Sequence, residues 1–174
     1  MNDDILIPAI WPEHPPVPAG RPSLLRLPQA GPRFTARAAT RAAARTILGA
    51  WCGHPIGLRE TPRGPRPDGV AETRGLRLSF SYIGTEAWIA FHAGPVGLDV
   101  CAVADFPERA ELTRLYLPGT SDDVPVEVFA RRWARLEATL KYQGRGLSEH
   151  ASVAAPRQLR DRTESGVALA LAWD

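Results

Sequence analysis

The chain has 174 residues, 44% of them hydrophobic, and a formal net charge of +2. This length is enough to bury a core, and so small a net charge argues against bulk nucleic-acid binding. Its two cysteines form no CxxC pair, so neither a zinc site nor a disulfide framework is indicated. No basic signal peptide begins the chain, and no apolar run reaches the roughly 20 residues of a membrane span. We therefore expect a monomeric cytoplasmic protein that binds neither nucleic acid nor a membrane.

Proline marks off the start of the chain. Eight of the 17 prolines precede Phe34, so residues 1–32 are expected to be an extended segment with at most one short strand at Ser23–Leu27. Residues 33–52 are free of proline and rich in Ala and Arg, which predicts a helix. Its expected buried stripe is Phe34, Ala38, Ala42, Ile47 and Trp51. Its basic ridge, with an arginine at every fourth position, is Arg33, Arg37, Arg41 and Arg45.

The middle of the chain changes from loop to strands. Residues 53–75 hold four prolines and five glycines, which predicts a loop with a short strand around 56–59. Three strands are expected next, with turns at Gly84-Thr85 and Gly94-Pro95 between them. Their expected ranges are 76–81, 87–92 and 96–103.

Helices and further strands complete the chain. A helix pair is predicted at 107–116 and 126–143, followed by two or three strands with a turn at Ser165-Gly166. The order of helix, strands, helices and strands predicts an α+β fold. We expect an N-terminal half at 33–94 and a C-terminal half at 95–174.

Asp99 is the unusual residue of the third central strand, "VGLDVCAV". Alternation places Val96, Leu98 and Val100 on one face of that strand, and Asp99 and Cys101 on the other. A charged residue in an apolar strand requires a partner for its charge. From this strand alone, two interpretations stay open: an edge-strand Asp paired with an Arg, or a functional carboxylate.

The helix "FARRWARLEATLKYQGRGL" carries Trp133, Glu137 and Lys141 on one face, because they lie four residues apart. This row is either a core-edge Trp beside an ordinary surface ion pair, or one wall of a site. The two glycines in "QGRGL" are a C-terminal stop signal, with Gly144 or Gly146 available for the left-handed position.

Asp99 and Glu137 together suggest metal chemistry. Two carboxylates on different elements, with a lysine one turn away, suit Mg²⁺-dependent phosphoryl transfer. Magnesium takes few protein carboxylates and fills its remaining positions with water and phosphate oxygens, while a lysine offsets phosphate charge. This requires that the strand and the helix pack together.

The order and spacing of these motifs resemble the 4'-phosphopantetheinyl transferase superfamily, particularly its Sfp-type members. Those enzymes carry a "GxDIE"-like strand and, some 35 to 45 residues later, a helix like "WxxKEAxxKxxGxGL". This chain has "VGLDVC" and "WARLEATLKYQGRGL". Upstream, "SFSYIG" is similar to the family's "NxSHSG", the helix at 33–52 to its N-terminal Arg-rich helix, and "RGPRP" to its basic loop.

The resemblance implies a fold of two similar α/β halves related by a pseudo-twofold, with coenzyme A in the cleft between them. It further implies transfer of the phosphopantetheine arm of coenzyme A to a serine of an acyl or peptidyl carrier protein, as in secondary metabolite biosynthesis, with release of 3',5'-ADP. Asp99 and Glu137 would bind Mg²⁺, Glu137 would be the base, and Lys141 would act on the phosphates. The expected coenzyme A contacts are Arg63, Arg66, Ser81, Tyr82 and Lys141.

Three positions depart from the family pattern. Cys101 stands where a second strand acid is usual, Leu136 where a Lys precedes the helix Glu, and Tyr82 where a His contacts phosphate. The N-terminal half is also reduced. An alternative function is therefore a catalytically silent relative that binds carrier protein or coenzyme A without transferring anything.

The arginine ridge of the first helix also has two interpretations. It can face coenzyme A phosphates or an acidic helix of a carrier protein, where charge pairing would guide docking. Alternatively it is a solvated face that keeps an Ala-rich helix soluble. A nucleic-acid-binding module on this helix is disfavoured by the small net charge and the lack of interleaved aromatic residues.

Overall fold

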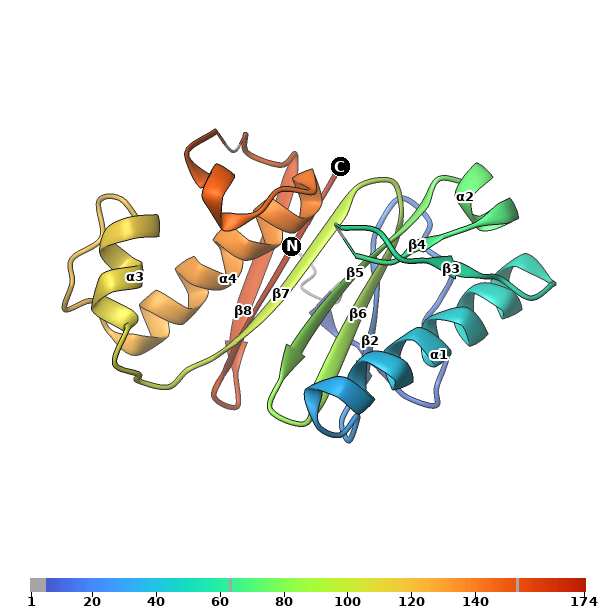
Figure 1. Cartoon of the computed structure of the whole chain (residues 1–174), viewed down its shortest axis with the longest axis horizontal. Helices are drawn as coiled ribbons and strands as arrows, with labels where there is room; N and C mark the ends of the chain where they lie inside the picture. The colour runs from blue at the N-terminus through green and yellow to red at the C-terminus, as the bar shows by residue number, and fades with distance from the viewer. Residues whose placement is uncertain (1–5, 63, 153) are drawn as a thin grey trace.

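Two sheets lie back to back in the middle of this computed structural model, and one long helix covers the outer face of each (Figure 1). The structure describes residues 6–62, 64–152 and 154–174. The fold class is mixed α+β, as the sequence predicts. Within the described residues, no helix combines the length and the apolar character that crossing a bilayer requires.

The N-terminal unit contains a four-stranded sheet, one long helix and a small hairpin. Its elements are β1 Ala9–Ile10, β2 Ser23–Leu27, α1 Arg33–Cys52, β3 Leu58–Arg59, β4 Arg66–Pro67, α2 Gly69–Thr73, β5 Leu76–Ile83 and β6 Glu86–Ala93. The sheet order is β1-β2-β6-β5, so the proline-rich segment contributes an internal strand to this sheet. The expected loop at 53–75 holds the β3–β4 hairpin and α2, of which only a short strand was predicted.

The C-terminal unit contains a three-stranded sheet and two helices. Its elements are β7 Val96–Ala102, α3 Arg109–Tyr116, α4 Val126–Gln143, the 3-10 helix η2 Leu147–Ser152, β8 Gln158–Glu164 and β9 Val167–Trp173. The sheet order is β7-β9-β8, and both pairings are antiparallel. Helix α4 ends where the sequence predicts, with Gly144 in the left-handed region at φ 65°.

The two units order their main strands alike. In each, the first strand is hydrogen-bonded to the last, and the last to the middle one: β2-β6-β5 in one unit and β7-β9-β8 in the other. Each unit also places its long helix between its first and middle strands. The Gly94-Pro95 turn leads directly from the last strand of one unit to the first strand of the next.

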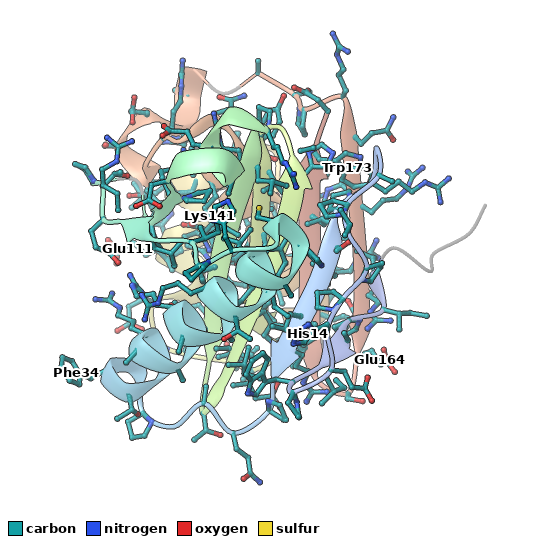
Figure 2. The ribbon with its side chains drawn as sticks, turned by 90° about the vertical axis from the view of Figure 1, so that its right-hand side faces the viewer. His14, Phe34, Glu111, Lys141, Glu164 and Trp173 are labelled. Atoms are coloured by element: carbon teal, nitrogen blue, oxygen red, sulfur yellow. The ribbon has the colours of Figure 1, made fainter. Side chains whose placement is uncertain are left out.

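The buried stripe expected on α1 is partly wrong. Phe34 is 87% exposed and points away from the body of the molecule (Figure 2). Ala38 and Ala42 are also exposed, whereas Ile47 is buried and Trp51 half-buried as expected. The other buried side chains of α1 are Ala36, Thr40, Ala43, Ala44 and Leu48. An Ala-rich helix has no strong hydrophobic face, because alanine fits either a buried or an exposed position, so its rotation was set by the sheet it packs on.

The alternation expected in β7 is confirmed. Val96, Leu98 and Val100 are buried between the two sheets, in a cluster with Trp88 of β6 and Leu171 of β9. The opposite face of β7 lies against α4. A Cβ on Gly97 would come within 1.8 Å of the Ala138 carbonyl oxygen, so the helix backbone rests directly on the strand there.

Alanine makes this close approach possible along the whole interface. Three alanines of α4 pack on three alanines of β9: Ala130, Ala134 and Ala138 on Ala168, Ala170 and Ala172. All six are fully buried. Small side chains shorten the distance between helix and sheet, and this brings the row of Trp133, Glu137 and Lys141 up to the edge of β7.

We predict that Gly97→Ala destabilises the protein by about 2–3 kcal/mol or more, because the added methyl meets backbone atoms of α4 that cannot rotate away. Chemical denaturation measures the change. The control is Gly146→Ala, where a Cβ meets no atom within 4 Å and the effect should stay within about 0.5 kcal/mol. Equal effects of the two substitutions would contradict the close packing of α4 on β7.

Candidate active site

Lys141 of α4 joins the two units at the seam between β5 and β7. Its Nζ donates to Asp99 Oδ1 at 2.7 Å, to the Leu98 carbonyl at 3.1 Å and to the Phe80 carbonyl at 3.3 Å. These three acceptors match the three donors of an ammonium group. The pair is largely shielded from water, with side-chain exposures of 30% for Lys141 and 10% for Asp99. Asp99 therefore has a charge partner, but this partner is the lysine and not an arginine.

Two serines of β5 complete the seam. Ser79 Oγ accepts a hydrogen bond from Leu98 N at 2.9 Å, and Ser81 Oγ accepts one from Val100 N at 3.1 Å. Ser81 also donates to Asp99 Oδ1 at 3.0 Å. Backbone N–H groups at a buried strand edge need acceptors, and here side-chain hydroxyls supply them. Ser81, expected to contact coenzyme A, thus orients the Asp99 carboxylate.

Glu137 lines the same cavity as Asp99, one helical turn before Lys141. In the described part of the chain no side chain or backbone group forms a hydrogen bond or ion pair with its carboxylate. Burial raises the pKa of Glu137, the negative charge of Asp99 raises it further, and Lys141 offsets part of the rise. The site therefore brings two acids and a single ammonium to the lining of one cavity.

This donor set fits a magnesium ion. Two carboxylates that share one cavity, one of them without a partner, are the few protein ligands that Mg²⁺ uses. A second cation would relieve the mutual repulsion that raises the Glu137 pKa. The described residues contain no group of three His, Cys, Asp or Glu side chains suited to a metal, so water and ligand oxygens would complete the coordination.

Cys101 and Leu136 differ in how they relate to this cavity. Cys101 lines it, and burial, with the nearby charges of Asp99 and Glu137, raises the thiol pKa to about 11. The thiol is therefore neutral at pH 7 and a poor ligand for Mg²⁺. Leu136 packs instead toward α3, in a cluster with Phe129, so a charged residue there would not face the two acids.

Trp133 supports the site by packing. Its ring stacks on Phe129 at 5.7 Å and meets Tyr116 edge-on at 5.9 Å. Its other side lines the cavity with Glu137. The row of Trp133, Glu137 and Lys141 is thus a cavity wall, and Lys141 forms its ion pair with Asp99 instead of with Glu137.

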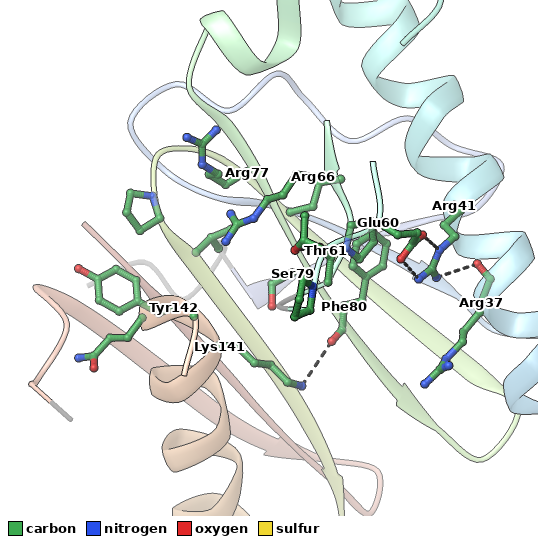
Figure 3. A pocket seen from close by; sticks show the side chains of 18 of the residues that line it. Arg37, Arg41, Glu60, Thr61, Arg66, Arg77, Ser79, Phe80, Lys141 and Tyr142 are labelled. Atoms are coloured by element: carbon green, nitrogen blue, oxygen red, sulfur yellow. Dashed lines mark hydrogen bonds and ion pairs between the residues drawn. The ribbon is translucent and has the colours of Figure 1, made fainter. Parts of the chain in front are cut away.

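A basic cleft opens beside this cavity (Figure 3). It has a volume of about 570 Å³, within the range of small-molecule sites. Among the described residues its charged lining is mostly cationic, with five basic side chains and one acid: Arg37, Arg41, Arg66, Arg77, Lys141 and Glu60. Phe80, Tyr82 and Lys141 line both hollows, so the cleft and the two-acid cavity form one continuous surface.

The remaining predicted contacts have different positions. Tyr82 lies between cleft and cavity, with its hydroxyl 3.0 Å from Thr40 Oγ1 and 3.5 Å from Arg41 Nη1. Arg66 lines the cleft from β4. Arg63 lies outside the described residues. The structure thus brings five predicted site residues to the continuous surface of cleft and cavity: Arg66, Tyr82, Lys141, Asp99 and Glu137. Ser81 is buried beneath this surface, where it supports Asp99.

Four charged residues of the cleft were not assigned as ligand contacts from the sequence. Arg77 shares a strand face with Ser79 and Ser81, so the alternation of β5 could have predicted that Arg77 lies on the same side as these serines. Glu60 follows a two-residue strand in a proline-rich loop, where no periodicity exists to place it. Arg37 belongs to the ridge whose two interpretations were left open, and it lines the cleft together with Arg41.

Comparison with known proteins gives no independent assignment. No family model matches this chain, and no curated protein does either. The functional interpretation therefore rests on the geometry of the site and on the motif resemblance.

We predict a strong coupling between Lys141 and Asp99. Lys141→Met alone leaves a buried carboxylate without its cation and should cost about 1–3 kcal/mol, whereas adding Asp99→Asn should recover much of that loss. A double-mutant cycle by urea denaturation measures the coupling. The control cycle uses the exposed pair Arg114 and Asp122, at 3.3 Å, where about 0.5 kcal/mol or less is expected. A Lys141–Asp99 coupling no larger than this control would refute the central role of the pair.

We also predict that Glu137→Gln stabilises the metal-free protein at pH 7. Because the folded-state pKa of Glu137 is raised, folding opposes its ionisation, and stability falls as pH rises from the ordinary Glu pKa through the folded value. The substitution should raise the melting temperature by about 1–3 °C at pH 7 and by almost nothing at pH 4. The control substitution Glu13→Gln, at an exposed position, should leave the melting temperature unchanged at both pH values. A loss of stability at pH 7 would show that the Glu137 carboxylate is a structural group.

Proposed function

We propose that this protein transfers the 4'-phosphopantetheine arm of coenzyme A to a serine of an acyl or peptidyl carrier protein, in a Mg²⁺-dependent reaction that releases 3',5'-ADP. The observation that carries the proposal is the meeting of Asp99, Glu137 and Lys141 at one end of a basic cleft. These residues come from two separate sequence motifs, and Mg²⁺-dependent phosphoryl transfer requires that the two motifs lie side by side. Phosphoryl transfer uses this combination of acids for a metal and cations for phosphate.

The strand order adds support for the superfamily fold. Two units with the same order of strands and the same place for the long helix are what a pseudo-twofold arrangement of similar halves requires. The cleft is lined from both units: by α1, the β3–β4 hairpin and β5 on one side, and by β7 and the end of α4 on the other. We propose that coenzyme A lies across this junction.

The basic cleft suits the phosphate groups of coenzyme A. Arginine side chains bind phosphate oxygens in a planar fork, and Arg37, Arg41 and Arg66 supply three such groups on one side of the cleft. Lys141 lies where the cleft meets the two acids. The pyrophosphate of the ligand would therefore lie near Lys141, with its other phosphate toward the arginines.

The proposed chemistry assigns a role to each of these residues. Asp99 and Glu137 would hold Mg²⁺, which when bound neutralises charge on the pyrophosphate. Glu137 accepts the proton of the carrier serine as general base. The serine oxygen then forms a bond to the β-phosphorus as the bond to the 3',5'-ADP oxygen breaks. The positive charge of Lys141 offsets the negative charge that develops on the phosphate oxygens.

A second candidate is a silent relative that binds coenzyme A or carrier protein without transfer. It is favoured by the neutral thiol of Cys101 where a third acid would stand, and by Lys141 and Ser81 sharing Asp99 Oδ1. Both features reduce the negative charge available to a metal. The two candidates agree on ligand binding and differ only in turnover.

Intact-mass spectrometry separates these candidates. The protein is incubated with Mg²⁺, coenzyme A and a panel of apo carrier proteins, and we expect at least one carrier to gain a phosphopantetheine arm. Asp99→Asn and Glu137→Gln should each slow transfer by about 100-fold or more, while exposed Asp122→Asn should leave it unchanged.

Two results would contradict the proposal. Absence of transfer across the panel, with coenzyme A binding intact by calorimetry, would favour the silent relative. Full activity of either the Asp99 or the Glu137 variant would refute the metal assignment even if transfer occurs. Circular dichroism of each variant ensures that a loss of activity is not a loss of folding.

A further inference from the structure

Glu60 occupies the guanidinium fork of Arg41 inside the basic cleft. Arg41 Nε donates to Glu60 Oε1 at 2.5 Å, and Arg41 Nη2 donates to Glu60 Oε2 at 3.0 Å (Figure 3). This parallel two-point contact is the same one that an arginine makes with two phosphate oxygens. Glu60, the one acid that the described residues contribute to the cleft lining, thus lies on the group best suited to bind a phosphate.

Arg41 is held in place by more than Glu60. Its Nη1 donates to the Arg37 carbonyl at 3.1 Å and to the Tyr82 hydroxyl at 3.5 Å, and its guanidinium carbon lies 5.9 Å from the Phe80 ring centre. Only 22% of the Arg41 side chain is exposed. The fork would therefore keep its orientation if the carboxylate left.

Glu60 is the movable member of the pair. It lies between β3 and β4, at the start of the connecting turn, and its side chain is 60% exposed. Arg41 is its only hydrogen-bond partner among the described residues, and removal of the carboxylate requires no change in the sheet or in α1. An anion entering the cleft can take its place while the Glu60 side chain turns out into water.

We propose that Glu60 is an internal competitor for the phosphate site, an autoinhibitory contact that lowers the affinity of the cleft for anions until a phosphate group displaces it. This inference rests on the proposed function of the cleft as a phosphate site. It makes Arg41 the specific group at which ligand and protein carboxylate compete. The cleft binds an incoming phosphate only in the fraction of molecules whose Arg41 fork is open, so the apparent affinity falls by that fraction.

An orienting role for Glu60 would predict the opposite change in ligand affinity. If Glu60 served to orient Arg41 for the ligand, its removal would weaken binding. If Glu60 is a competitor, its removal strengthens anion binding, and this gain in affinity requires Arg41. The direction of the change in affinity therefore decides between the two roles.

The test measures binding of inorganic pyrophosphate by calorimetry, without metal, to the full chain. Glu60→Gln should bind pyrophosphate about two- to tenfold more tightly than the unsubstituted protein. The matched control is Glu72→Gln, which removes the same charge from an ion pair with Arg59 of β3, and neither of these two residues lines the cleft. Its affinity should be unchanged within about 1.5-fold.

The same substitution made in an Arg41→Gln variant shows whether Glu60 and the ligand compete for Arg41. In Arg41→Gln the added Glu60→Gln substitution should give no further gain, because the contested fork is gone. A gain that persists there, or that Glu72→Gln reproduces, would reduce Glu60 to a general negative charge and overturn the inference. Weaker binding by Glu60→Gln would overturn it in favour of an orienting role. If no variant binds pyrophosphate, the phosphate cleft itself is refuted; equal binding by all variants refutes only the competitor.

Discussion

The ammonium group of Lys141 is the interaction on which the site depends. It lies between the edge strands of two sheets and binds a carbonyl from each, together with the Asp99 carboxylate. Among the described residues no ladder of backbone hydrogen bonds joins β5 to β7, so the serine hydroxyls and this lysine provide the polar contacts across the seam. The same contacts place the only lysine of the chain between a two-acid cavity and a basic cleft.

Charge balance explains much of the arrangement. Lys141 offsets the negative charge of Asp99, and Glu60 offsets the positive charge of Arg41, so each half of the hollow is partly neutralised by a side chain of opposite sign. Glu137 has no such partner among the described residues, and its pKa is raised as a result of burial and of Asp99. A magnesium–phosphate ligand carries both signs of charge, and it complements a hollow organised in this way.

Close packing makes the charge arrangement possible. Glycine at position 97 and the alanines of α4 and β9 let the helix backbone rest on the sheet. A larger residue there would move Glu137 and Lys141 away from β7. The hydrogen bonds from Lys141 to Asp99 and to the Leu98 carbonyl would then become too long to stabilise the site. The small residues of this interface are thus as much a part of the site as its charged ones.

The sequence by itself determined the elements that carry the central motifs and the charged residues on them. Periodicity and stop signals predicted α4 at its observed bounds, and alternation predicted which face of β7 carries Asp99. Only the tertiary structure decided that Asp99 and Lys141 pair, that Leu136 faces away, and that Glu60 reaches Arg41. It also rotated α1 away from the expected stripe. The physical reason is that local patterns fix the direction of a side chain within its own element, whereas contacts between elements depend on how closely their surfaces pack.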